Sequence, residues 1–197
     1  KSGWQLALDR KLWNRTAAVT ANSESVANFY HSIVGIPRER LHVIPNAVVC
    51  PSPVYSRDEA RQQLGFSNEH KVIGFIGRLA PQKRLRDLMW AFQLLQQIIP
   101  EVRLAIIGQG PERDAMTNMA INFGCRDKIV FAGHRDDASS LLVGMDAFVL
   151  PSEFEGMSNS LMEAMSAGVP VAVSDIAPNR ELVTHLETGF VVPLGDR

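Results

Sequence analysis

The feature of this sequence that most constrains its fold is the stretch from Asp146 to Val173. A short apolar run at 147–150 precedes a polar loop, and apolar residues then recur at helical spacing until Gly168, after which a second apolar run begins at 169–173. This order of strand, loop, helix and strand is typical of a βαβ unit with two parallel strands. The polar loop then lies at the carboxyl end of the first strand, where open parallel sheets bind ligands.

The same alternation of strands and helices runs through most of the chain. The apolar patterns predict strands at 72–76, 102–107, 129–131 and 189–192, and helices at 57–64, 85–99, 111–123, 137–144 and 177–185. Strands that alternate with helices of this length form parallel sheets through right-handed crossovers. We therefore expect an α/β fold, with a Rossmann-like parallel sheet flanked by helices.

The beginning of the chain has a separate pattern. It predicts a helix at 1–15, strands at 16–21 and 41–44, and between them a helix that starts after Asn22 or Ser23. The first helix carries an apolar stripe among basic residues, which favours packing on a neighbouring domain over contact with a membrane surface. Repeated prolines then indicate a linker at about 45–54.

Three parts are therefore expected. They are a remnant of a second Rossmann-like domain at residues 1–44, a linker with the helix that leads into the main domain at 45–70, and the main domain at 71–197. Because the chain begins at Lys1 without a methionine, we also expect a fragment or a processed form from which a partner domain is absent.

Composition excludes several classes of protein. A formal net charge of −1 gives no basic face for nucleic acid. No apolar run approaches the roughly 18 residues of a spanning helix, and no signal-peptide pattern opens the chain. Cys50 and Cys125 have no CxxC partner, so neither a zinc site nor a disulfide framework is indicated, and a reducing cytoplasm fits best.

Two cations follow the strand at 72–76 directly. Arg78 and Lys83 lie in the segment that begins at Gly77, so they are expected at the same sheet edge as the loop that contains Glu155. Two cations facing the amides at a helix start would bind a diphosphate. A solvated basic turn is the competing interpretation, because Arg84 and a further arginine are nearby.

Three carboxylates, Glu153, Glu155 and Glu163, fall within eleven positions of the central unit. Glu153 is interpreted as a loop charge. Ser160 and Glu163 have the spacing of a capping box, in which the glutamate bonds back to the helix start. If the helix starts as early as Ser158, Glu163 lies in the second turn and can instead accept bonds from two ribose hydroxyls.

Other nucleotide and catalytic motifs are incomplete. Gly108 and Gly110 follow a strand, but the third glycine of a dinucleotide fingerprint is replaced by Arg113, so a tight turn explains them. No P-loop sequence occurs, and the segment from Gly156 to Ser160 lacks the last glycine of a nucleophile elbow. His134 follows the strand at 129–131 and is a candidate for lining a pocket.

Five segments together resemble the retaining group 1, family 4 glycosyltransferases of GT-B fold. They are Val43–Ala47, Gly77–Lys83, Gly108–Pro111, Phe131–His134 and Pro151–Val171. They occur in the expected order and cover essentially the whole chain. The most specific part is the pair of glutamates with seven residues between them, Glu155 and Glu163, preceded by Pro-Ser and followed by Ala-Met-Ser-Ala-Gly.

The resemblance implies roles for individual residues. Arg78 and Lys83 would hold the donor diphosphate and stabilise it as the leaving group, and with Glu155 they are the expected catalytic residues. Glu163 would bind the ribose. The remaining donor-binding residues would be Gly77, Gly133, His134, Gly156, Met157, Ser158 and Asn159, with the loop from Gly133 to Arg135 near the base.

The resemblance also implies a reaction. The enzyme would transfer a sugar from a nucleotide diphospho-sugar, with UDP- or GDP-sugars as the expected donors, without a cofactor or metal ion. Its acceptor would be a glycan or lipid in polysaccharide, lipid-linked glycan or glycoconjugate synthesis. It would be cytoplasmic, with peripheral association at the inner face of a membrane allowed.

The resemblance also implies that parts of such an enzyme are absent. Most of the acceptor-binding domain and the last crossover helix after Arg197 would be missing, so this fragment alone is expected to be inactive. A non-catalytic nucleotide-diphosphate-binding module and a sugar-nucleotide epimerase are the alternative functions.

Overall fold

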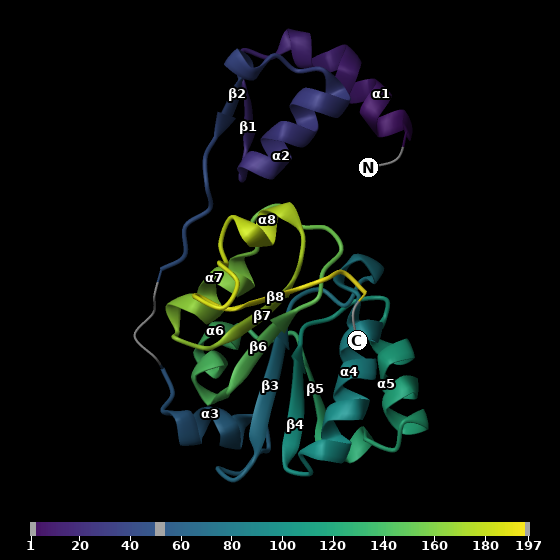
Figure 1. Cartoon of the computed structure of the whole chain (residues 1–197), viewed down its shortest axis with the longest axis vertical. Coiled ribbons are helices and arrows are strands. Elements are labelled where there is room, and N and C mark those ends of the chain that lie inside the picture. Colours follow the sequence, from purple (N-terminus) through teal and green to yellow (C-terminus); the bar gives the residue numbers. More distant parts are fainter. Residues whose placement is uncertain (1–2, 50–53, 196–197) are drawn as a thin grey trace.

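The computed structural model describes residues 3–49 and 54–195. Its first part forms a small unit at one end of the molecule (Figure 1). The elements are α1 (Gly3–Leu12) with a 3-10 turn at Trp13–Arg15, β1 (Val19–Ala21), α2 (Glu24–Phe29) continued by a π-helical turn at Tyr30–Val34, and a 3-10 turn at Arg38–Arg40 before β2 (Leu41–Val43). β1 and β2 are parallel, and Val34, Ile36 and Leu41 form a small core beneath them.

The second part is built on a six-stranded parallel sheet in the order β5-β4-β3-β6-β7-β8. The strands are β3 (Lys71–Ile76), β4 (Val102–Ile107), β5 (Ile129–Gly133), β6 (Ala147–Leu150), β7 (Val171–Ser174) and β8 (Phe190–Val192). The predicted α/β fold with a parallel sheet is confirmed.

Helices cover both faces of this sheet (Figure 1). They are α3 (Arg57–Gln63), α4 (Leu85–Ile98), α5 (Arg113–Asn122), α6 (Ala138–Leu141) with a 3-10 turn at Leu142–Gly144, α7 (Asn159–Ser166) and α8 (Ala177–Arg180). α4 packs against α5, whereas α6 packs against α3 and α7. The chain moves outward from β3 to β5 and then returns to the other side of β3, so right-handed crossovers put these two groups on opposite faces.

This strand order creates a switch point between β3 and β6. The loops after these two neighbouring strands leave toward opposite faces of the sheet, which opens a crevice at their carboxyl ends. In such sheets ligands bind in that crevice. The fold therefore places the two segments in which the sequence predicts cations and carboxylates side by side.

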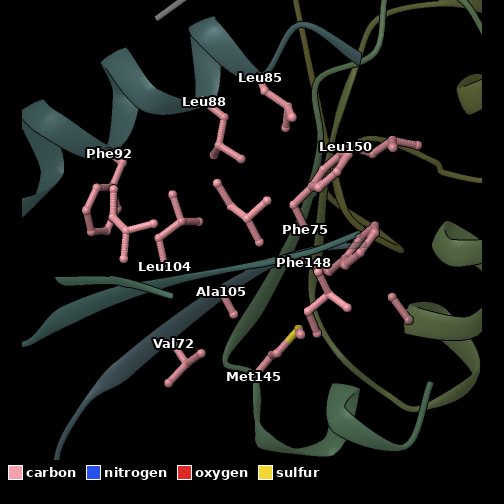
Figure 2. Close-up of a cluster of buried hydrophobic side chains, with 14 of the residues drawn as sticks. Val72, Phe75, Leu85, Leu88, Phe92, Leu104, Ala105, Met145, Phe148 and Leu150 are labelled. Carbon is pink, nitrogen blue, oxygen red and sulfur yellow. The ribbon is translucent and has the colours of Figure 1, made fainter. Parts of the chain in front are cut away.

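One hydrophobic core fills both faces of the sheet. Figure 2 shows part of it, with Phe75 from β3 and Phe148 from β6 among side chains of α4 and β4. Position 74 in β3 requires glycine, because a Cβ at this position would lie 1.9 Å from the sulfur of Met145. This packing holds β3 and β6 together, and thereby fixes the positions of the loops that follow them.

A buried arginine joins the amino ends of these same strands. Arg61 on α3 is only 2% exposed and donates to the carbonyl oxygens of Gly144, Ser67 and Asn68 at 2.8–3.3 Å. It also donates to Asp146 at 2.8 Å, and the same carboxylate oxygen accepts the amide of Val72 at 2.7 Å. Since Val72 is in β3 and Asp146 precedes β6, the network fixes both strands at the edge opposite the crevice.

Most element boundaries agree with the predicted ones within two residues. The helix predicted at 111–123 begins at Arg113, because Pro111 and Glu112 form a turn. The helix predicted to reach His185 ends at Arg180, and turns follow it. The described residues include the predicted linker only as far as Val49 and again from Val54, and Cys50 lies outside them.

No helix in the described part of the chain has both the length and the apolar character needed to cross a membrane.

Candidate functional site

The loops after β3 and β6 are in direct contact. The amide of Glu153 donates to the carbonyl oxygen of Gln82 at 2.8 Å. Lys83 is the residue after Gln82, and Glu155 is two residues after Glu153. The Nζ of Lys83 lies 2.5 Å from Oε1 of Glu155. Their side chains are only 14% and 12% exposed, so this ion pair is largely shielded from water. A lysine and a glutamate that are 72 positions apart in sequence thus meet at the switch point.

Local backbone geometry places Lys83 there. Residues Pro81–Lys83 form a single 3-10 turn, with proline at its favoured first position. Arg84 then adopts a left-handed conformation with φ of 50°, which reverses the chain before α4 starts. The stem of Lys83 passes over Gly77, since its Cε is 3.8 Å from the position of a Cβ at Gly77. The side chain therefore runs back from the turn toward the end of β3.

The base of the loop after β6 is fixed by buried polar groups. The hydroxyl of Ser174, at the end of β7, donates to the carbonyl oxygen of Ser152. Asn179 in α8 donates to the carbonyl oxygen of Ser174 at 2.9 Å. Ser152, Ser174 and Asn179 are each at most 3% exposed. These buried hydrogen bonds set the direction in which the loop leaves the sheet, whereas the hydroxyl of Ser152 is itself buried and has no partner among the described residues.

The start of α7 has backbone amides without a hydrogen-bond partner among the described residues. Ser158 is the N-cap, because its hydroxyl accepts the amide of Leu161 at 3.4 Å. None of the amides from Gly156 to Ser160 donates a hydrogen bond within residues 3–49 and 54–195. Unpaired amides at the positive end of a helix attract anions. The loop and the helix start thus have the unpaired amides that suit an anion, in a loop that contacts Lys83 through Glu155.

Glu163 does not form the capping box that the sequence allowed. With Ser158 as N-cap, Glu163 lies in the second turn of α7. Its carboxylate makes no hydrogen bond or ion pair with the described residues, and partial burial raises its pKa. A half-buried acceptor without a partner is available to a ligand, although no described contact joins it to the other predicted site residues.

A cavity of about 350 Å³ lies beyond the end of β3. Gly77, Arg78 and His134 line it, together with Gln109 and Arg135. Arg78 is exposed and has no hydrogen-bond or ion-pair partner in the described part of the chain. An arginine that is not held by a carboxylate is free to bind an anion with its planar guanidinium.

The second arginine of this cavity is held by a carboxylate. Arg135 forms two hydrogen bonds with Asp137, both of 2.7 Å, and the hydroxyl of Tyr55 donates to the same carboxylate at 2.9 Å. The hydrogen bonds from Arg135, and to a smaller extent the one from Tyr55, lower the pKa of Asp137 to about 2. Arg135 is therefore a fixed wall of the cavity, in contrast to Arg78.

Glycines allow the neighbouring loops to approach this cavity closely. The amide of Gly108 donates to the carbonyl oxygen of Gly133 at 2.7 Å, and that of Leu79 donates to the carbonyl oxygen of Gln109 at 2.9 Å. Gly108 has φ of 135°, and a Cβ there would lie 1.9 Å from the carbonyl oxygen of Gly77. The Gly108 turn is thus required for the loops after β3, β4 and β5 to meet.

The structure brings most of the predicted site residues to one edge of the sheet. Lys83 pairs with Glu155, which precedes the loop from Gly156 to Asn159, and its stem passes over Gly77. Arg78 and His134 line one cavity together with Gly77. Gln109, Asn46 and Asn22 lie near this edge and were not predicted as site residues. Gln109 follows β4, and Asn46 follows β2 and contacts the loop after β6. Among residues 3–49 and 54–195, no cluster of three or more His, Cys, Asp or Glu side chains is arranged to hold a metal ion.

Two family models match the sequence. Residues 56–197 match the model described as glycosyl transferases group 1, and residues 1–52 match the model described as glycosyltransferase family 4.

Curated relatives agree with these matches. An N-acetyl-alpha-D-glucosaminyl L-malate synthase of Bacillus anthracis is 30% identical over 182 residues, which are 90% of this chain and 46% of that protein. A UDP-Gal:alpha-D-GlcNAc-diphosphoundecaprenol alpha-1,3-galactosyltransferase of Escherichia coli is 31% identical over 163 residues, or 80% of this chain and 42% of the other. The chain spans about half the length of the curated relatives it matches.

Solved structures share the arrangement of the elements. Alr3699/HepE of Anabaena, crystallised in complex with UDP and glucose, has a TM-score of 0.88 and 27% identity. The match covers 100% of this chain and 55% of that one. A sucrose-phosphate synthase from Thermosynechococcus elongatus has a TM-score of 0.85 at 21% identity, which is a likeness of fold alone.

Proposed function

Because the chain belongs to the group 1 glycosyl transferases, we propose that it binds the nucleotide diphospho-sugar donor of a glycosyl transfer that retains the anomeric configuration. The acceptor would be bound by the rest of the protein together with residues 1–44. The observation that carries this proposal is the contact between Lys83 and Glu155 beside the unpaired amides that precede α7.

The proposed chemistry follows from the charge that develops during transfer. When the bond between the sugar and the diphosphate breaks, negative charge accumulates on the leaving nucleoside diphosphate. Lys83, held by Glu155, and the amides of Gly156 to Asn159 would be preorganised positive groups beside that charge, and such groups lower the barrier without a metal ion or cofactor. Arg78, which has no partner among the described residues, would add its guanidinium when the donor binds. Glu155 would orient Lys83 and contact the donor sugar.

Lys83 is able to bind Glu155 and a phosphate group at the same time. Its ammonium group has three protons, and one is used by Glu155. The other two remain for phosphate oxygens. The ion pair thus restrains a flexible side chain before the donor arrives, which reduces the entropy lost on binding.

Known relatives support UDP as the nucleotide of the donor. The structural neighbour from Anabaena was crystallised with UDP, and the name of the Escherichia coli relative specifies a UDP-sugar. Within the proposal, Glu163 binds the ribose hydroxyls, and the cavity lined by Gly77, His134 and Arg135 accepts the base. GDP is the second candidate.

The proposal extends to the acceptor and the location of the protein. The acceptor would be a glycan or a lipid-linked glycan, processed in the cytoplasm or at the inner face of a membrane. Trp4, Leu8 and Leu12 of α1 are exposed, and basic residues occupy the last turn of this helix. Such a surface suits either a neighbouring domain or peripheral contact with anionic lipid.

Binding of nucleotides tests the proposal directly. Calorimetric titration with UDP, GDP and ADP should give measurable affinity for UDP. Replacing Lys83→Ala should weaken that affinity by about 1.5–3 kcal/mol, which is the contribution of a charged hydrogen bond and corresponds to roughly 10- to 150-fold.

The matched control is Lys71→Ala. Lys71 is exposed at the first position of β3, at the opposite edge of the sheet, and its loss should leave the affinity unchanged. A chain that binds none of the three nucleotides would contradict the proposal. Equal affinities of the Lys83 variant and the unmodified chain would remove Lys83 from the site.

A further inference from the structure

Two asparagines of the first part of the chain lie against the loop after β6. Asn22 follows β1 directly, and Asn46 lies three residues beyond β2. Because β1 and β2 are parallel and in register from Val19 and Leu41 onward, their carboxyl ends meet at one edge. That edge faces the carboxyl edge of the larger sheet (Figure 1). The two sheets thus bring their carboxyl edges together around the proposed donor loop.

The side chain of Asn46 makes two hydrogen bonds across this junction. Its Nδ2 donates to the carbonyl oxygen of Met157 at 3.2 Å and to Oδ1 of Asn159 at 2.8 Å. The carbonyl oxygen of Met157 is only able to accept, so the nitrogen of Asn46 must face it. Both protons of this amide group are therefore used, and an aspartate at this position would have none to offer.

The bond to Met157 controls the direction of an adjacent amide. A trans peptide is planar, with its carbonyl and N–H pointing to opposite sides. When the carbonyl oxygen of Met157 turns toward Asn46, the amide of Ser158 turns away from it. Ser158 is the N-cap of α7, and its amide is one of those left without a partner in the described residues.

Asn22 restrains the same loop one residue earlier. A Cβ at Gly156 would lie 2.7 Å from Oδ1 of Asn22, so the amide of Asn22 rests directly on the backbone of Gly156. The loop is thus held at Gly156 by contact and at Met157 and Asn159 by hydrogen bonds. Both restraints come from residues more than 100 positions earlier in the sequence.

From this arrangement we propose that Asn46 is a positioning residue of the donor site. It orients the peptide between Met157 and Ser158 so that the loop amides point at the phosphate nearest the sugar. The inference rests on the proposed function, because it assigns Asn46 to the same site. It adds that diphosphate binding depends on a side chain from the other side of the interdomain junction.

The test compares a nucleoside diphosphate with its monophosphate, UDP and UMP, in calorimetric titrations of the full chain. Asn46→Asp keeps the size of the side chain but removes both donated hydrogen bonds and adds a negative charge. Each such bond contributes on the order of 1 kcal/mol, so the affinity for UDP should fall about tenfold or more. The affinity for UMP, which lacks the second phosphate, should change less than about twofold.

Two further variants separate positioning from folding. Asn118→Asp makes the same chemical change on the exposed surface of α5 and should alter neither affinity. Asn46→Gln retains a donor amide and should recover part of the UDP affinity lost in Asn46→Asp.

Each outcome decides the inference. Selective loss of UDP binding supports it. Unchanged UDP binding, or an equal loss of UDP and UMP binding, overturns it while leaving the proposed function standing. If the unmodified chain binds no nucleotide, the proposed function itself is overturned.

Discussion

The environment of Glu163, a residue of the proposed donor site, makes the folded chain less stable. Glu163 is a half-buried carboxylate without a partner among the described residues, and partial burial raises its pKa above the ordinary value of 4.5. Partial loss of water around an ionised carboxylate destabilises the folded chain. Such a cost is expected where a group is kept ready for a ligand rather than for the core.

The free energy of unfolding of the Glu163→Gln variant, measured as a function of pH, tests whether the charge of Glu163 destabilises the folded chain. A raised pKa means that the folded chain binds the proton more tightly than the unfolded chain does. The stabilising effect of that proton is complete below pH 4.5 and is lost as the pH rises through the pKa of the folded state. Removing the charge should therefore raise the free energy of unfolding at neutral pH, measured by urea denaturation, and have little effect below pH 4.5.

The same variant should bind UDP more weakly, because a neutral amide is a poorer acceptor for two ribose hydroxyls. Glu101→Gln, on an exposed residue before β4, serves as the control and should change neither quantity. A Glu163 variant that is less stable than the unmodified chain at both pH values would instead indicate a structural role in α7.

At the scale of elements, the carboxyl edge depends on how closely the loops approach one another. The turn at Gly108 touches the backbone of Gly77, so the position of Arg78 depends on a residue of another strand's loop. Backbone packed against backbone leaves no room for a side chain, and neither partner is able to move like a flexible side chain.

Gly108→Ala tests this dependence. The added Cβ would collide with the carbonyl oxygen of Gly77, in addition to the strain of a positive φ. We expect the free energy of unfolding to fall by more than about 2 kcal/mol and UDP binding to weaken in the fraction that folds.

Gly124→Ala is the matched control. Gly124 also has a positive φ, of 64°, but no other atom of the described residues lies within 4 Å of the added Cβ. The free energy of unfolding of the Gly124→Ala variant should therefore fall only by the cost of the positive φ, about 1 kcal/mol, and its affinity for UDP should be unchanged. Equal effects of the two substitutions, measured by urea denaturation and calorimetry, would show that the contact with Gly77 is unimportant.

The sequence predicts the elements well where apolar periodicity is strong. β4 and β6 have the predicted boundaries, because apolar residues dominate both strands and none of their residues is exposed. Helix starts are harder, since Ser158 and Ser160 are both capable caps and only the loop geometry selects Ser158. The edge rule for parallel strands also anticipates that Lys83 and Glu155 lie close together.

The sequence does not predict the contacts between the two sheets. Asn46 lies in a motif that resembles the family, yet its hydrogen bonds to Met157 and Asn159 depend on how the first part of the chain docks. The same holds for the contact of Asn22 with Gly156. Local propensity and apolar spacing contain no information on this docking, so only the three-dimensional structure reveals these contacts.

At the scale of the whole molecule, the two parts are joined by polar groups as well as by the chain. Glu181, which follows α8, accepts the backbone amides of Glu24 and Ser25 at 3.0 and 2.7 Å. These amides are the first of α2, so a carboxylate from one part stabilises the positive end of a helix in the other. α2 and α8 are also in contact at this point.

Glu181→Ala should therefore loosen the junction without unfolding either sheet. Hydrogen exchange at the amides of Glu24 and Ser25 is expected to accelerate, whereas exchange in β3 and β4 should be unchanged. Glu187→Ala, on an exposed residue nearby in sequence, is the control and should leave all of these amides as they are. Unaltered exchange at Glu24 and Ser25 would show that Glu181 does not hold the two parts together.

The buried network of Arg61 and Asp146 has a further consequence. It anchors β3 and β6 at the edge opposite the proposed donor site, so the positions of the two strands depend on contacts that the donor loops do not make. The residues that hold the strands together are thus different from those proposed to bind the donor. Donor preference is therefore expected to change through substitutions at an exposed loop position such as Phe154, whereas Glu155 and the N-cap Ser158 have to be kept.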